Sequence, residues 1–182
     1  IFRRVESDES CIISTVIDLN PDINNIAYTL NYDSIFGQRN RDLKVKVENG
    51  FLIYGNEKPV KYASSKYVKL ELLNDIDILI DCTGEQRDPL KYQKFFEYKP
   101  TLRVIVTNCN KKIGKYLVLG ANQDTINWKE ERLFCSSICD ATAVAPVLTV
   151  IQKKYGIDFL HMTTVHPWLN YQNLLDGPST SW

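Results

Sequence analysis

The chain has 182 residues, of which 44% are hydrophobic, and its 22 lysines and arginines balance its 22 aspartates and glutamates. This length suits one domain, or one domain with part of a second, and the apolar content argues against a disordered chain. The zero net charge gives no support to a nucleic acid or an acidic membrane surface as a partner. No apolar run approaches the roughly 18 residues of a membrane span, so no membrane association is expected.

The five cysteines are an odd number at irregular spacings, which does not suit a disulfide framework. Most lie in apolar segments, and the charged residues among the first ten do not suggest a secretory leader. We therefore expect reduced thiols in a cytoplasmic protein. Four of them, Cys11, Cys82, Cys109 and Cys135, are expected to be inert core residues.

Apolar patterns alternate with turn residues in the first half of the chain. Residues 11–17 are rich in β-branched side chains and predict a buried strand that ends at Asp18. Residues 21–30 predict a helix with Pro21 in its first turn. The remaining predicted elements are a helix end at 1–5, a β-hairpin of 43–47 and 51–54, and a short strand near Val60.

The second half combines buried strands with one long helix. Strands are predicted at 76–80, 103–106 and 116–119, and a final strand at 157–165. Residues 139–155 form the clearest helix, closed by Gly156. Buried strands mixed with helices indicate an α/β nucleotide-binding domain with a mostly parallel sheet.

Several short motifs follow one another along the chain. Cys139-Asp-Ala-Thr-Ala-Val-Ala-Pro146 precedes Met162-Thr-Thr-Val-His166 and Asp176-Gly-Pro-Ser179. Upstream of these stand Tyr32-Asp33-Ser34 with Gly37, Cys82-Thr83-Gly84, and Gly120-Ala-Asn122. In order and spacing, the set closely resembles the glyceraldehyde-3-phosphate dehydrogenase family, whose catalytic cysteine opens a helix and whose catalytic histidine ends a Thr-Thr-Val-His motif.

The resemblance implies an α/β fold with two parts. Residues 1–138 would be a Rossmann-type NAD-binding domain lacking its first strand and Gly-rich loop, and residues 139–182 would begin an α+β catalytic domain. Family members oxidise aldehydes such as glyceraldehyde-3-phosphate with NAD, usually as homotetramers. On this interpretation the chain is a fragment, and we expect the 182 residues alone to be inactive.

Cys139 and His166 are the candidate catalytic residues. A cysteine at a helix start is favoured as a thiolate by the backbone N–H groups and the helix dipole, whereas a structural cysteine would be buried and inert. A lone histidine after an apolar segment is more often a core residue, but its motif implies a base paired with Cys139. Such a pair attacks an aldehyde to give a thiohemiacetal, and hydride transfer to NAD then gives a thioester.

Asp18 is the candidate cofactor discriminator, because a carboxylate at a strand end accepts hydrogen bonds from a ribose 2′-hydroxyl and repels a 2′-phosphate. The alternative is an ordinary aspartate at the end of a strand. By resemblance, Arg4, Thr83 and Thr107 would also lie near the NAD. No metal site is expected.

Three residues depart from the family pattern around the phosphate sites. Ile138 and Asp140 replace the serine and threonine that usually flank the catalytic cysteine, and Leu169 replaces a threonine after the histidine. Loss of three hydroxyl donors and gain of a carboxylate disfavour a phosphate dianion. The alternatives are therefore a related dehydrogenase of sugar-derived aldehydes with water as acyl acceptor, or a non-catalytic binding relative.

Overall fold

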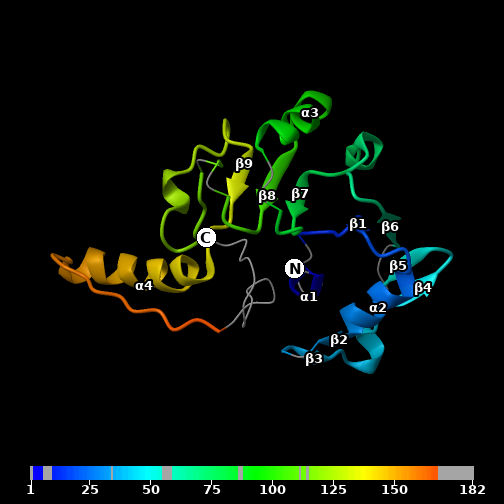
Figure 1. Cartoon of the computed structure of the whole chain (residues 1–182), viewed down its shortest axis with the longest axis horizontal. Helices are drawn as coiled ribbons and strands as arrows, with labels where there is room; N and C mark the ends of the chain where they lie inside the picture. Colours follow the sequence, from blue (N-terminus) through cyan, green and yellow to red (C-terminus); the bar gives the residue numbers. More distant parts are fainter. Residues whose placement is uncertain are drawn as a thin grey trace, which may run out of the picture. The chain divides into compact units, whose positions relative to one another are not determined.

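The computed structural model shows a mixed α/β protein (Figure 1). The chain divides into two compact units. The first unit comprises Ile1–Asp81 and Arg87–Ile105, and the second comprises Cys82–Gln86 and Val106–Trp182. The structure describes residues 2–5, 10–33, 35–54, 59–85, 88–110, 112–113 and 115–167.

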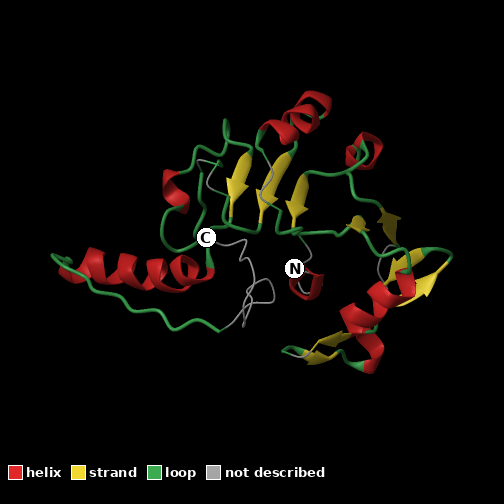
Figure 2. Cartoon of the chain, viewed as in Figure 1, coloured by secondary structure: helices red, strands yellow, loops and turns green. Residues whose placement is uncertain are grey.

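Both units mix helices and strands, as Figure 2 shows by colour. The helices and strands of the first unit are, in chain order, α1 (Phe2–Val5), β1 (Thr15–Asp18), α2 (Ile23–Asn31), β2 (Tyr32–Asp33), β3 (Gly37–Gln38), β4 (Lys46–Glu48), β5 (Phe51–Ile53), β6 (Val60–Ser64), β7 (Ile78–Asp81), α3 (Leu90–Tyr98) and β8 (Arg103–Val106), whose last residue is counted in the second unit. Short 3₁₀ helices lie at Arg41–Leu43 and Leu70–Leu73.

The main sheet of the first unit contains four strands in the order β1-β6-β5-β4. The predicted hairpin is confirmed as the antiparallel pair β4–β5. Asn49 and Gly50 connect these strands, and both have positive φ, which suits the twist of a tight hairpin turn. Only β1 and β6 are parallel, so this sheet is mixed and not mostly parallel as predicted. Strands β7 and β8 are neighbours in a separate sheet.

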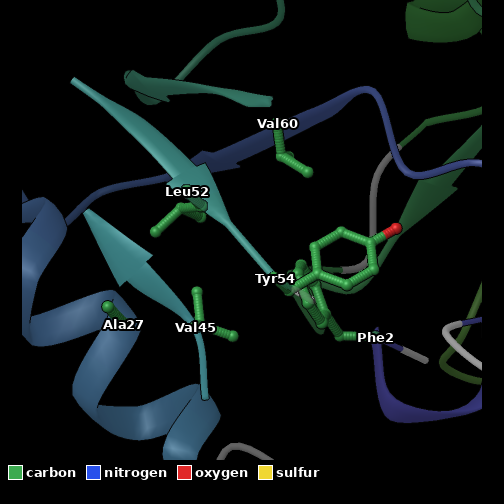
Figure 3. Packing of buried hydrophobic residues seen from close by; sticks show 6 residues of the cluster. All are labelled: Phe2, Ala27, Val45, Leu52, Tyr54 and Val60. Atoms are coloured by element: carbon green, nitrogen blue, oxygen red, sulfur yellow. The ribbon is translucent and has the colours of Figure 1, made fainter. Parts of the chain in front are cut away.

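Buried apolar side chains from α1, α2 and this sheet form the core of the first unit (Figure 3). Leu52 and Val60 are fully buried, and Phe2 packs its ring edge-on against Tyr54. The alternation of β5, with Leu52 buried between half-buried neighbours, places every second side chain in this core.

The second unit contains β9 (Leu133–Cys135), a 3₁₀ helix at Gln123–Thr125 and the long helix α4 (Cys139–Tyr155). Directly after β9, the Ser136 N–H donates to the carbonyl of Val106, the last residue of β8. The buried residues of the second unit are Val106, Ile113, Val118, Ile126, Phe134 and Cys135, together with the polar Asn110. The prediction of α4 is confirmed at both ends, and Gly156 closes it with φ +77°.

Several predicted elements differ from the structure. Strand β1 is shorter than 11–17, and α2 begins after Asp22, whose side chain caps it by accepting from the Asn24 N–H. The predicted strand at 116–119 is reduced to a single bridge between Tyr116 and Cys135. No strand forms at 157–165, because an extended segment is a strand only when a neighbour completes its ladder, and none of the described residues does so. Helix α3, the β2–β3 pair and β9 were not predicted.

Candidate active site

Cys139 is the first residue of α4 and is exposed. The chain enters the helix through Ser137, a non-glycine residue with φ +70°, and Ile138, which is extended. Ile138 occupies the cap position but has no side-chain acceptor for the first N–H groups. A non-glycine residue with positive φ two positions before Cys139 is the kind of backbone strain that collects at functional sites.

The return of the chain along α4 brings His166 to the start of the helix (Figure 1). The 17 residues of α4 span about 25 Å at 1.5 Å per residue. An extended chain advances about 3.3 Å per residue, so roughly eight residues cover the same distance in reverse. Gly156 reverses the direction, and the segment 157–165 provides this length.

The two predicted catalytic side chains are in contact. The Nε2 atom of His166 lies 3.3 Å from the Sγ atom of Cys139, although the two residues are 27 positions apart. The other ring nitrogen, Nδ1, lies 2.7 Å from the Pro167 carbonyl, which can only accept, so Nδ1 carries a proton. In the neutral ring this leaves the Nε2 lone pair directed at the thiol.

Asp140 adds a third functional group to this pair. Its Oδ1 atom lies 3.6 Å from Cys139 Sγ, and ligating atoms of Cys139, Asp140 and His166 all lie within 4.8 Å of one another. The sequence identified Asp140 as a carboxylate directly after the cysteine, in place of a threonine near the phosphate sites. Its position next to the cysteine in the first turn is the signal that could have placed it in the cluster.

A close contact fixes the middle of α4. A Cβ atom added to Gly120 would lie 3.0 Å from the Pro146 Cβ, and Gly120 has φ +84°. Asn122 holds the same turn, because its side chain accepts from the Val118 N–H and donates to the Tyr116 carbonyl. The Gly-x-Asn motif and the proline of the helix motif therefore meet in one packing contact, which orients the helix that carries Cys139.

The other cysteines correct one expectation. All five are free, but Cys11 and Cys82 are exposed, Cys109 is half-buried, and only Cys135 is buried. Cys11 and Cys82 are therefore not core residues in this chain. Cys135 donates to the Asn108 carbonyl and accepts from the Asn110 N–H, which suits a structural role.

Asp18 lies at the carboxyl end of β1 in the first unit and is exposed. Its Oδ1 accepts from the Asn20 N–H at 2.9 Å. Burial, together with the negative charges of Asp18 and Asp22, raises the pKa of Tyr62, whose hydroxyl donates to the Asn20 carbonyl. Asp18 and Asp22 thus place two carboxylates near Tyr62.

Thr83 follows β7 and Thr107 follows β8; both threonines are exposed and belong to the second unit. The Asn108 side chain donates to the Glu85 carbonyl at 3.3 Å, which joins the two loops that carry the threonines. Arg4 belongs to α1 of the first unit. The structure thus brings the two threonine loops together and does not place them relative to Asp18. Leu169 and Asp176–Ser179 lie outside the described residues.

Among the described residues, no helix combines the length and apolar character needed to cross a membrane.

Comparison with known proteins agrees with the motifs. The family model "Glyceraldehyde 3-phosphate dehydrogenase, C-terminal domain" matches residues 138–182. The glyceraldehyde-3-phosphate dehydrogenase of Geobacillus stearothermophilus is 28% identical over 181 residues, which cover 98% of this chain and 52% of the relative. Glyceraldehyde-3-phosphate dehydrogenase 2 of Bacillus subtilis (strain 168) is 27% identical, with 98% and 52% covered. The enzyme of Clostridium pasteurianum is 30% identical, with 97% and 52% covered.

The chain spans about half the length of the curated relatives it matches. The matches nevertheless extend over almost all of this chain, from the first unit to the segment that carries His166. Together with the order of the motifs, they show that the chain is similar to glyceraldehyde-3-phosphate dehydrogenases over almost its whole length.

Proposed function

We propose that the full-length protein is an NAD-dependent aldehyde dehydrogenase in which Cys139 is the nucleophile and His166 its base. The observation that carries this proposal is the 3.3 Å contact between Cys139 Sγ and His166 Nε2 at the start of α4. Nothing in the packing of α4 requires this pair, because both side chains are exposed and the helix has no buried residue. An exposed thiol paired with an oriented imidazole is a general signature of nucleophilic catalysis.

His166 accepts the thiol proton at Nε2, and its Nδ1–H stays on the Pro167 carbonyl and keeps the ring in place. The thiolate then adds to the aldehyde carbon, forming a C–S bond while the carbonyl electron pair moves to oxygen. The imidazolium returns its proton to that oxygen, which gives a thiohemiacetal. Bound NAD would supply the hydride acceptor that converts this adduct into a thioester.

Asp18 fits the adenosine side of an NAD site, because it is an exposed carboxylate at the carboxyl end of a parallel strand. The negative charges of Asp18 and of Asp22 in the cap of α2 would repel the 2′-phosphate of NADP. Arg4, Thr83 and Thr107 complete the proposed cofactor contacts. The bond that joins the two threonine loops supports a common role for them.

The proposed domain division is a Rossmann-type NAD-binding domain over residues 1–138, followed by the start of an α+β catalytic domain over residues 139–182. The family match supports this boundary, since its C-terminal domain model begins at residue 138. A homotetramer is proposed from the resemblance to the family. A cytoplasmic location is supported by the five free thiols.

The proposed substrate is an aldehyde like glyceraldehyde-3-phosphate. The proposed acyl acceptor differs from the phosphate that is usual in the family. Ile138 offers no hydroxyl, and Asp140 places a carboxylate oxygen 3.6 Å from the sulfur. These two residues favour water over phosphate as the group that resolves the thioester.

The decisive experiment assays the full-length protein with NAD or NADP and a panel of phosphorylated and unphosphorylated aldehydes. Turnover is expected with NAD and an aldehyde. The ratio of the initial rate with NAD to that with NADP should be smaller in Asp18→Ala than in the wild type. Cys139→Ser is the matched control for contaminating activity. Absence of turnover with every aldehyde would favour a non-catalytic binding relative, and a wild-type preference for NADP would remove the proposed role of Asp18.

A further inference from the structure

The cluster at the start of α4 contains more than the proposed catalytic pair needs. A thiol, an imidazole nitrogen and a carboxylate oxygen converge there, from Cys139, His166 and Asp140. These three chemical groups are the usual ligands of Zn²⁺ in proteins. We propose that they bind a thiophilic divalent cation, for which Zn²⁺ is the reference, and that the bound cation blocks the reactivity of Cys139.

The distances suit a single tetrahedral ion. Zinc bonds of about 2.3 Å to sulfur and about 2.0–2.2 Å to nitrogen and oxygen separate neighbouring ligand atoms by about 3.4–3.6 Å. In the structure, Sγ lies 3.3 Å from His166 Nε2 and 3.6 Å from Asp140 Oδ1. The remaining pair of ligand atoms, on Asp140 and His166, lies within 4.8 Å.

The histidine is already oriented as a metal ligand. A ligating histidine commonly donates its second ring N–H to a carboxylate or backbone carbonyl, which fixes the free nitrogen toward the metal. Here Nδ1 donates to the Pro167 carbonyl at 2.7 Å, and Nε2 faces the sulfur. Cys139 and His166 are exposed, so a hydrated ion reaches them from solvent.

Asp140 supplies the third ligand of this site. A threonine, which usually follows the catalytic cysteine in the family, would leave only two ligands of this kind. Binding replaces the thiol proton, which passes to solvent, with a sulfur–metal bond. The sulfur lone pair that would attack an aldehyde is then committed to the cation. Hard cations such as Mg²⁺ prefer oxygen ligands and are not expected to bind here.

The test uses the reduced full-length protein and measures binding without reference to turnover. Co²⁺ serves as a spectroscopic probe, and a chromophoric chelator measures the affinity for Zn²⁺. The variants are Asp140→Ala and Asp140→Asn, and Asp158→Ala is the matched control because Asp158 is an exposed carboxylate of the same unit outside the cluster.

Wild type is expected to show a thiolate-to-cobalt charge-transfer band. Asp140→Ala should weaken Zn²⁺ binding at least about tenfold, since loss of outer-shell partners alone costs 10–100-fold. Asp158→Ala should bind as wild type does, and Zn²⁺ but not Mg²⁺ should protect Cys139 from alkylation. No charge-transfer band in wild type, or wild-type affinity in both Asp140 variants, would overturn the proposal. Because binding is read directly, this result is independent of whether the protein oxidises aldehydes.

Discussion

Two neighbouring regions of the second unit each present a cysteine, in opposite surroundings. At the end of β9, Cys135 is fully buried and hydrogen-bonded to the backbone at Asn108 and Asn110. Four residues later, Cys139 opens a helix that has no buried residue, and its partner is a histidine side chain. Residue type and sequence proximity therefore say little about the role of a thiol. The atoms that its sulfur contacts are more informative.

Replacement of each sulfur by oxygen is the strongest test of this contrast. Cys139→Ser is expected to lower aldehyde oxidation by about 10⁴-fold or more, because the hydroxyl is a far weaker nucleophile at neutral pH. Its stability should change by less than about 0.5 kcal/mol, as for other surface substitutions. Cys135→Ser should retain activity and lose about 1–2 kcal/mol of stability. Initial rates and urea unfolding of the full-length protein measure both effects, and equal activity losses would contradict the contrast.

The next test separates exposure from activation. His166→Gln should lower aldehyde oxidation by about 10²–10⁴-fold, the usual contribution of a general base. It should also slow alkylation of Cys139 to the rate of Cys11 and Cys82, which are exposed and show no histidine contact among the described residues. Mass mapping after brief labelling at neutral pH gives the rates. If Cys139 reacts no faster than Cys11 in wild type, exposure alone accounts for its reactivity.

A smaller effect is expected for phosphate as acyl acceptor. Two unit charges about 5 Å apart at an effective dielectric near 20 repel by roughly 3 kcal/mol, or about two orders of magnitude in affinity. Asp140 should therefore suppress activation by phosphate, and Asp140→Thr should restore it. Turnover measured against phosphate concentration checks this, with arsenate as a second acceptor. Strong saturable activation of the wild type would show that other residues supply the phosphate site.

The smallest predicted effect concerns the packing that orients α4. Gly120→Ala should destabilise the protein by about 1–3 kcal/mol, because the new methyl group meets Pro146 and φ is positive. Gly156→Ala is the matched control, since Gly156 has a similar φ but no atom within 4 Å of the added Cβ. The difference between the losses of unfolding free energy in Gly120→Ala and Gly156→Ala measures the cost of the contact with Pro146. Equal losses would mean that Pro146 moves aside freely.

Local signals predicted some parts of the fold well. Helix α4 was predicted at both ends because Gly156 is a strong stop signal, and the β4–β5 hairpin because Asn49-Gly50 specifies its turn. The prediction of a strand at 157–165 was wrong. An apolar pattern indicates which side chains could be buried, but a strand also needs hydrogen bonds from a neighbouring strand, and none of the described residues provides them. Helix α3 was missed although Tyr92 and Phe95 lie three apart on its buried face.

The candidate site was predictable only in part. The motifs placed Cys139 and His166 in one reaction, and the structure brings them to 3.3 Å, but their catalytic roles remain to be tested. The sequence placed Asp140 next to Cys139, and the structure adds that its Oδ1 atom lies 3.6 Å from the sulfur. The exposure of Cys11 and Cys82 could not be predicted from the sequence either. Apolar neighbours in a strand or loop do not indicate which of its faces packs against the rest of the protein.

The out-and-back path from Cys139 to His166 restricts how this stretch of chain can change in length. Helix and return segment advance by different amounts per residue, about 1.5 Å and 3.3 Å. An insertion of one helical turn, about four residues, moves the turn at Gly156 outward by about 5.4 Å and must be matched by about two residues in the return segment. A single-residue insertion in α4 also rotates the faces on either side of it by about 100°. Length variants that keep both the Gly120–Pro146 contact and the cysteine–histidine pair should therefore be rare and should occur in paired steps.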